Sequence, residues 1–151
     1  MPAFRKVLLL KSDDVDLIPL RKALRAHAKV TEVDTLADLA RLLGKGDYDA
    51  LFCGWDVAGG TWQDALNEVQ RRASELPVVV VARLGGEKQW VEVLGQGAFD
   101  MITAPYQIQT VLYLLEHAAA SKAARTLSPH FGALNKESSN ESANNLPASP
   151  S

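Results

Sequence analysis

Three carboxylates stand where the sequence could bind a cation or a phosphoryl group. Asp13 and Asp14 follow an apolar run that ends at Leu10, and Asp56 follows the run Asp49–Cys53 within the stretch DALFCGWDVAGG. Carboxylate oxygens are the ligands that hard cations such as Mg²⁺ prefer. These residues are therefore candidates for a metal or phosphoryl site. The competing interpretation is that they are solvated loop carboxylates, the usual state of aspartate.

The other reactive residue types stand alone. Cys53 is the single cysteine and lies in an apolar run, where we expect it to behave as a small buried hydrophobe. The histidines His27, His117 and His130 are far apart and lack metal-ligand spacing. The pair Gly59–Gly60 has neither the spacing nor the lysine of a P-loop, so we expect a flexible turn. We therefore predict that this protein is not an enzyme and that it has no catalytic residue and no resident cofactor.

Short apolar runs alternate with stretches of helical spacing, and this alternation predicts an α/β fold. Parallel strands need crossover connections, which helices supply, so we expect a doubly wound parallel sheet with its functional loops at the carboxyl ends of the strands. The predicted strands are Phe4–Leu10, Lys29–Val33, Asp49–Cys53, Pro77–Ala82 and Phe99–Thr103, and the predicted helices lie within 14–28, 35–46, 61–75, 86–97 and 105–125.

Some helix ends can also be predicted from residue type. Thr35 and Thr61 are placed to begin the second and third helices, since a threonine hydroxyl accepts a hydrogen bond from an unpaired backbone N–H. Gly44 or Gly46 is expected to end the second helix by adopting the left-handed conformation.

Composition limits the class of protein. A net charge of −2 argues against a nucleic-acid binder, which usually carries a basic stripe. The N-terminal apolar run Val7–Leu10 is far too short to span a membrane, so we expect a cytoplasmic protein. Residues 1–125 suffice for one domain, whereas 126–151 are rich in Ser, Asn and Pro. We predict that this second segment is a disordered tail in which Phe131 and Leu134 are the anchor candidates.

Four stretches of this chain resemble, in order, the receiver domain of bacterial response regulators. They are VLLLKSDD, DYDALFCGWD, LPVVVVA and GQGAFDMITAPY. The last piece is the most specific, because Gly97–Ala98, Asp100 and Pro105–Tyr106 reproduce the family's Gly-Ala-x-Asp and Pro-aromatic spacing. The resemblance implies a flavodoxin-like (βα)5 sandwich with strand order 2-1-3-4-5. It also implies a role in two-component signal transduction, where the family transfers a phosphoryl group from a histidine kinase to an aspartate with the help of Mg²⁺.

The family positions that carry this chemistry are altered in this sequence. The family's metal-binding acid pair falls on Lys11 and Ser12, and its acceptor aspartate falls on Gly54. The phosphoryl-binding hydroxyl falls on Ala82, the switch aromatic on Met101 and the charge-neutralising lysine on Ala104. Without the nucleophile no phosphoryl bond can form. The resemblance therefore implies a degenerate pseudo-receiver that binds no Mg²⁺. We expect Lys11 to pair with Asp13 or Asp56 in place of the ion.

Three hypotheses for function follow. The first is a receiver-like signalling module that acts by protein–protein interaction independent of phosphorylation. The second is an active phosphorelay receiver or Mg²⁺-dependent acidic site that uses Asp13, Asp14 and Asp56. The third is a small-ligand sensor that uses the vacated cleft.

The predicted partner is a signalling protein or a second copy of the chain, bound without nucleic acid or membrane. Receiver domains commonly pair through the face of the fourth helix, fifth strand and fifth helix, which makes Trp90, Met101, Tyr106 and Tyr113 the interface candidates. In the fourth helix Trp90 falls on the flank of a stripe formed by Val91, Val93 and Leu94. It is thus either partly buried against the sheet or an exposed anchor of the kind found at interaction hot spots.

Overall fold

The computed structural model describes residues 5–12, 17–83, 86–103 and 107–127, and its centre is a five-stranded parallel sheet. The sheet has the order β2-β1-β3-β6-β7, with β1 (Arg5–Leu10), β2 (Ala28–Val33), β3 (Ala50–Gly54), β6 (Val78–Ala82) and β7 (Asp100–Thr103). Because β6 and β7 are the fourth and fifth strands of this sheet along the chain, the predicted order 2-1-3-4-5 is confirmed.

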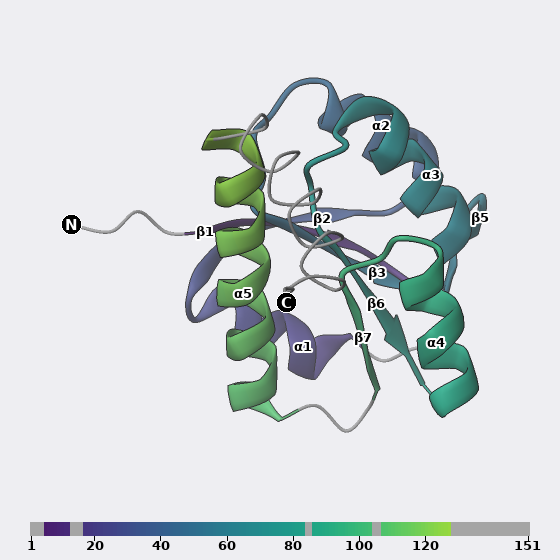
Figure 1. Cartoon of the computed structure of the whole chain (residues 1–151), viewed down its shortest axis with the longest axis vertical. Helices are drawn as coiled ribbons and strands as arrows, with labels where there is room; N and C mark the ends of the chain where they lie inside the picture. Colours follow the sequence, from purple (N-terminus) through teal and green to yellow (C-terminus); the bar gives the residue numbers. More distant parts are fainter. Residues whose placement is uncertain (1–4, 13–16, 84–85, 104–106, 128–151) are drawn as a thin grey trace, which may run out of the picture.

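Helices alternate with these strands as predicted (Figure 1). They are α1 (Ile18–Arg25), α2 (Leu36–Leu43), α3 (Trp62–Arg72), α4 (Glu87–Gly95) and α5 (Ile108–Leu127). The boundary predicted at residue 125 falls in the last turn of α5, and the tail that we predict to be disordered lies outside the described residues from 128 onward. None of the described helices is both long and apolar enough to cross a membrane.

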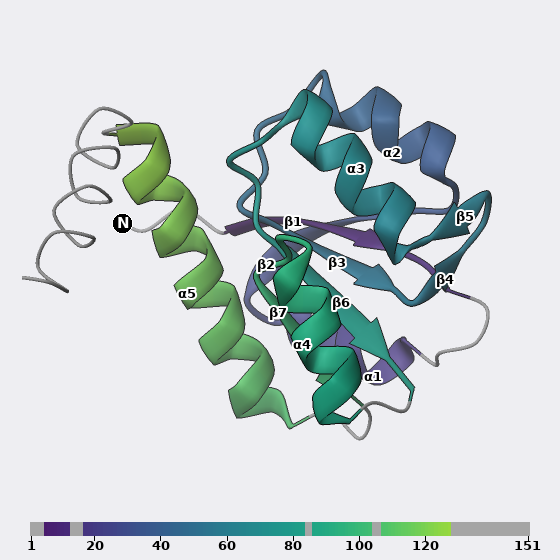
Figure 2. The same ribbon diagram turned by 45° about the vertical axis from the view of Figure 1, so that its right-hand side comes forward.

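The strands of the sheet are continuous apolar runs because helices cover both of its faces. Successive side chains of a strand point to opposite faces. Thus Val7 and Leu9 pack with residues of α1 and α5, whereas Leu8 and Leu10 pack with residues of α2 and α3. Figure 2 shows α2 and α3 together on one side of the sheet and α1 on the other.

Local signals account for the helix starts but not for every end. The Thr35 hydroxyl accepts from the Asp38 N–H at 3.1 Å, and the Thr61 hydroxyl accepts from the Gln63 N–H at 3.2 Å, so both predicted caps are confirmed. The left-handed end predicted for α2 is wrong, because Gly44 has a φ of −86° and the glycines with positive φ in the described part are Gly59 and Gly97. The Leu42 carbonyl instead accepts from the backbone N–H groups of Lys45 and Gly46, which closes the helix without that conformation.

Two short strands add a hairpin that the sequence analysis does not predict. They are β4 (Asp56–Val57) and β5 (Gly60–Thr61), paired antiparallel with Val57 opposite Gly60. Gly59 turns the chain between them with a φ of 102°, a conformation that glycine adopts without steric cost. The stretch Gly59–Gly60 therefore forms the turn of this hairpin.

Candidate functional site

The end of β3 has no space for a side chain. Gly54 is its last residue and is buried. A Cβ placed on Gly54 would lie 2.1 Å from the Ser12 Cβ and 3.2 Å from the Ser12 Cα, which is well inside van der Waals contact. The chain that leaves β1 therefore occupies, with Ser12, the place where a residue at position 54 would project.

The hairpin of β4 and β5 is fixed to the segments that follow β1 and β2. Ser12 forms an antiparallel bridge with Val57, and Thr35 forms a parallel bridge with Ala58. The Ala58 carbonyl also accepts from the Leu36 N–H at 3.1 Å. Since Ser12 and Thr35 follow the carboxyl ends of β1 and β2, the hairpin lies across the edge of the sheet where parallel α/β folds place their sites.

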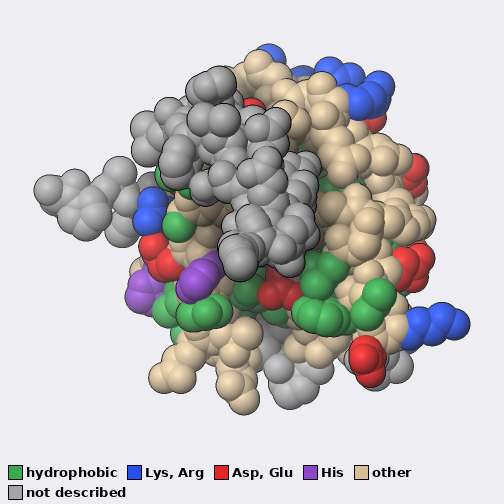
Figure 3. All heavy atoms as spheres, viewed as in Figure 1, with side chains coloured by type: hydrophobic (Ala, Val, Ile, Leu, Met, Phe, Trp, Pro, Cys, Tyr) green, Lys and Arg blue, Asp and Glu red, His purple; other side chains and the backbone are tan. Residues whose placement is uncertain are grey.

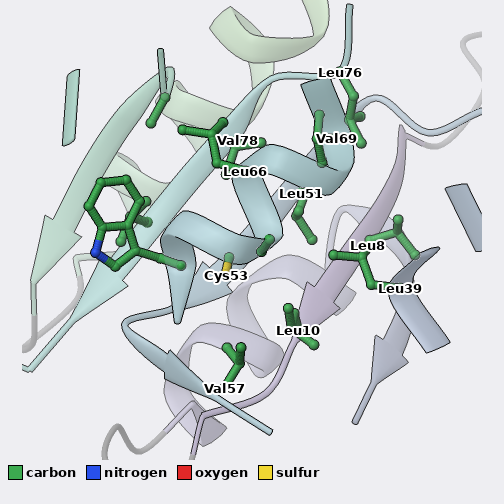
Figure 4. Close-up of a cluster of buried hydrophobic side chains, with 14 of the residues drawn as sticks. Leu8, Leu10, Leu39, Leu51, Cys53, Val57, Leu66, Val69, Leu76 and Val78 are labelled. Atoms are coloured by element: carbon green, nitrogen blue, oxygen red, sulfur yellow. The ribbon is translucent and has the colours of Figure 1, made fainter. Parts of the chain in front are cut away.

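Apolar side chains anchor this hairpin in the core. Val57 is 8% exposed and belongs to the buried cluster that contains Leu10 and Cys53 (Figure 4). The Trp55 and Trp62 rings, one on each side of the hairpin, have centroids 5.5 Å apart, and the Trp55 carbonyl accepts from the Trp62 N–H at 2.9 Å. The carboxyl end of β3 is thus covered by hydrophobic packing.

Lys11 forms ion pairs with acidic residues on and just after the neighbouring strand β2. Its ammonium lies 3.1 Å from the Asp34 carboxylate and 3.5 Å from that of Glu32. The hydrogen bond to Asp34 raises the pKa of Lys11 above its ordinary value, and the negative charges of Asp34 and Glu32 act in the same direction. The predicted pairing with Asp56 is wrong, because Leu10 lies opposite Val33 in the sheet and this register brings Lys11 beside Asp34.

Of the three acidic residues predicted as a site, the structure describes Asp56 alone. Asp56 is exposed on β4, while Asp13 and Asp14 lie outside the described residues. Within the described part of the chain, no group of three or more His, Cys, Asp or Glu side chains could hold a metal ion. Lys11, Ser12 and Gly54 do not supply the carboxylate donors of a Mg²⁺ site, so these residues do not fit that ion.

The remaining family positions add no reactive group among the described residues. Ala82 is buried at the end of β6 opposite Thr103, Met101 is half-buried in β7, and Ala104 lies outside the described residues. Cys53 is fully buried, and desolvation raises the pKa of its thiol far above the usual range. A buried thiol of this kind is an inert core residue.

The face formed by α4, β7 and α5 carries exposed hydrophobic side chains. Trp90 is 44%, Val91 56% and Tyr113 62% exposed, and Tyr106 lies outside the described residues. Figure 3 shows hydrophobic side chains over α5, with histidine beside them, and others over α4 and β7, with an acidic side chain between the two groups. We call the side chains of Trp90, Val91, Met101, Tyr113 and His117 the α4–α5 face.

Hydrogen bonds fix the tryptophan of this face. The Trp90 indole N–H donates to the Asp100 carboxylate at 3.0 Å, and the same oxygen accepts from the Met101 N–H at 2.8 Å. Trp90 is therefore held across β7, an edge strand of the sheet, while nearly half of its surface faces solvent. The predicted apolar stripe of α4 is partly wrong. Val93 is buried, but Val91 is exposed, because residues two apart in a helix lie on different sides of it.

Sequence reasoning missed the hairpin and two residues of the α4–α5 face. The alternation in Trp55-Asp56-Val57 and the following glycine pair were signals for a hairpin. His117 follows Tyr113 at the i+4 spacing of helix neighbours, and the two rings have centroids 4.1 Å apart. The exposure of Val91 had no local signal.

Comparison with solved structures identifies the fold as that of receiver domains. The receiver domain of a sensor histidine kinase from Pseudomonas aeruginosa, solved with a magnesium ion in its active-site cleft, matches with a TM-score of 0.67 and 19% identity over 78% of this chain and 99% of the other. A putative response regulator from Chloroflexus aurantiacus matches with a TM-score of 0.70 and 21% identity, again over 78% and 99%. The beryllofluoride-activated NtrC4 receiver domain dimer matches with a TM-score of 0.69 and 14% identity over 78% and 98%.

Sequence comparison adds nothing to this result. No protein-family model and no curated protein matches the chain. The similarity therefore establishes the flavodoxin-like receiver fold, and function has to be argued from the residues of this chain.

Proposed function

We propose that this protein is a receiver-like signalling module that has lost the phosphoacceptor chemistry and acts in the cytoplasm through protein–protein contacts. The observation that carries the proposal is the contact at the end of β3, where a Cβ at position 54 would lie 2.1 Å from that of Ser12. The acceptor position of a receiver domain is then not only without a carboxylate but also closed to one.

The surrounding charges support the same conclusion. Transfer of a phosphoryl group requires a nucleophile and cationic groups that stabilise the developing negative charge. Lys11 is the described cation nearest in sequence to Ser12, and it is already paired with Asp34 and Glu32. Ala82 offers no hydroxyl to a phosphoryl group. The hairpin also argues against a small-ligand sensor, because it lies across the sheet edge where such a cleft would open and its Val57 is buried in the core.

Intact mass measurement after incubation with a small acyl phosphate and Mg²⁺ tests the loss of chemistry. We expect no added phosphoryl group, while a receiver domain that retains its acceptor aspartate gains one in the same reaction. A phosphoryl group mapped to Asp13, Asp14 or Asp56 would instead establish the active-receiver hypothesis.

The α4–α5 face is the interaction surface that we propose. Exposed Trp and Tyr side chains are typical of interaction hot spots, and here Trp90 is fixed in place by Asp100 before any partner binds. A similar receiver domain, that of NtrC4, is described as a dimer, so a second copy of this chain is one candidate partner. A different signalling protein is the other candidate partner.

Capture experiments with single substitutions test this surface. Immobilised full-length protein, with and without Tyr113→Ser, is compared in extracts of the source cell and with free copies of the chain. Ile18→Ser is the matched control, since Ile18 is 51% exposed on α1. We expect Tyr113→Ser to reduce partner capture at least tenfold and Ile18→Ser to leave it unchanged. Equal capture by all three proteins would contradict the proposal.

A further inference from the structure

A groove with a volume of about 410 Å³ lies where α1 meets the start of α5. Figure 1 shows α1 beside the first half of α5, and buried side chains of the two helices share one core cluster. Small-molecule sites in proteins commonly have volumes of about 300–1,000 Å³, so the groove is large enough for a small ligand. The residues that line it are Pro19, Lys22, Ala23, Ala26, His27 and Ile108.

Most of the groove is apolar, because four of its six lining residues are proline, alanine or isoleucine. Ala23 is 6% exposed and packs in the core cluster, and Ala26 follows it at the three-residue spacing of helix neighbours. The side chains of these two alanines are single methyl groups, which leave space next to α1. The Ile108 side chain is 60% exposed, although isoleucine is among the residues most often buried. The hydrophobic effect therefore favours an occupant that covers Ile108 with apolar groups.

The groove also carries a lysine that has no ion pair among the described residues. α1 contains three basic residues, of which Arg21 and Arg25 both bind the Glu32 carboxylate, at 3.0 and 2.8 Å. Lys22 is exposed, and within the described part of the chain it pairs with no carboxylate. None of the described residues that line the groove is acidic. The groove thus has an apolar surface with a positive charge beside it.

His27 adds a second polar group to the same groove. Its imidazole carries an N–H donor whether or not the ring is charged, and the Lys22 ammonium carries three donors. An anionic group that is attracted to Lys22 can therefore also accept a hydrogen bond from His27. A cationic ligand would be repelled by Lys22, and a neutral apolar ligand would gain nothing from its charge.

We propose that this groove binds a small amphiphilic anion. The anionic group of the ligand pairs with Lys22 and accepts from His27. Its apolar body, an aryl or branched alkyl group, covers Ile108 and the two alanines. The site is separate from the end of β3, where the hairpin of β4 and β5 covers the edge of the sheet.

A matched pair of fluorescent probes tests the chemistry of the groove in the full-length protein. The probe 1-anilinonaphthalene-8-sulfonate joins an aryl body to an anionic group, and N-phenyl-1-naphthylamine has the same aryl body without the sulfonate. We expect the sulfonate to bind to one saturable site about tenfold more tightly than the neutral probe, as is typical of a hydrogen bond to a charged group. Added salt should weaken the binding of the sulfonate alone, because it screens the charge of Lys22.

Substitutions separate the charge from the apolar surface. Lys22→Gln should weaken binding of the sulfonate about tenfold and leave that of the neutral probe unchanged, since it removes only the charge. Ala26→Leu should weaken binding of both probes, because the larger side chain fills the groove. The matched controls are Lys29→Gln, at an exposed lysine of β2, and Ala124→Leu, at an exposed alanine of α5, and we expect both to bind the probes as the unchanged protein does.

Nuclear magnetic resonance locates the bound probe. We expect the sulfonate to shift the amide signals of Ala26, His27 and Ile108 in a saturable way and to leave those of Trp90 and Tyr113 in place. Shifts at Trp90 and Tyr113 instead would assign the probe to the α4–α5 face and overturn the proposal. Equal affinity for the two probes, or full affinity for the sulfonate in both Lys22→Gln and Ala26→Leu, would also overturn it.

The groove and the proposed interaction surface can be tested independently. The residues that line the groove are not among those of the α4–α5 face. If the probes fail to bind while Tyr113→Ser reduces partner capture, the groove is not a ligand site and the proposed function stands. If the sulfonate binds as expected while Tyr113→Ser leaves capture unchanged, the interaction face is wrong and the ligand site stands.

Discussion

At the scale of single residues, the proposed loss of phosphoacceptor chemistry rests on Gly54 and Ser12. The two residues are 42 positions apart in the sequence, yet the Ser12 side chain fills the space next to Gly54. The absence of a side chain at position 54 is therefore part of the packing at the end of β3, and adding a side chain there has to disturb the fold.

Replacing this glycine should lower stability. We expect Gly54→Ala to reduce the free energy of unfolding by about 1–3 kcal/mol, the usual cost of an overpacked core position. Urea denaturation measures the effect. Gly95→Ala is the matched control: its Cβ would meet no atom within 4 Å, and in a helix alanine is favoured over glycine by about 1 kcal/mol.

A double-mutant cycle identifies the cause of that loss. If the Ser12 Cβ is the obstacle, Ser12→Gly should recover most of the stability that Gly54→Ala removes, so that the two changes are strongly non-additive. Additive effects would show that position 54 requires glycine for another reason.

The thiol of Cys53 should be unreactive toward thiol reagents in the folded protein. Burial raises its pKa, so the thiolate fraction stays far below that of a free cysteine at any pH near neutrality, and the sulfur has no access to reagents. We expect no reaction with a disulfide reagent at pH 8 in buffer and complete reaction in denaturing urea. Rapid labelling without denaturant would contradict the burial of β3.

At the scale of elements, the hairpin of β4 and β5 determines what covers the carboxyl ends of the central strands. It joins the segments after β1, β2 and β3 through the Ser12–Val57 and Thr35–Ala58 bridges, and it closes the edge where these strands end. α4 and α5 are the elements of the proposed interaction surface, because they present exposed aromatic and aliphatic side chains on either side of β7.

The side chain of Val57 should hold this hairpin in place. We expect Val57→Ala to lower the free energy of unfolding by about 1–3 kcal/mol, since burial of a valine contributes about that much. It should also speed hydrogen exchange at the Leu36 amide, which is bound to the Ala58 carbonyl.

The neighbouring residue supplies the control. Asp56→Ala changes an exposed side chain on the same short strand and should alter neither stability nor exchange by more than about 0.5 kcal/mol, as is usual for surface substitutions. If both changes had the same effect, Val57 would not be the anchor.

Metal binding is a property of the whole molecule that can be measured without knowing the site. A ligand that binds the native state raises Tm, and at 100 times its Kd it adds about 2.7 kcal/mol. We expect millimolar Mg²⁺ to leave Tm unchanged relative to a sodium salt of equal ionic strength, because Lys11, Ser12 and Gly54 do not offer the required carboxylates. A stabilisation lost on Asp13→Ala, Asp14→Ala or Asp56→Ala would support the Mg²⁺-dependent alternative.

Features governed by neighbours in the sequence could be predicted. The five strands lie within one residue of their predicted ends, and Thr35 and Thr61 cap their helices, because apolar runs, turn residues and cap hydroxyls act over a few positions. The strand order followed from the family resemblance. The pairing of Lys11 with Asp56 and the end of α2 were predicted wrongly, because each depends on which groups the packed chain brings close.

The sequence by itself determined the alternation that folds into a covered parallel sheet, and it placed a residue without a side chain at the end of β3. Only the tertiary structure decided what surrounds that residue. The register of β1 with β2 turns Lys11 to Asp34, Ser12 comes to lie against Gly54, and Val57 enters the core as part of an unforeseen hairpin. These contacts join segments far apart in the chain, so they are set by packing and strand register, which no local pattern of residues encodes.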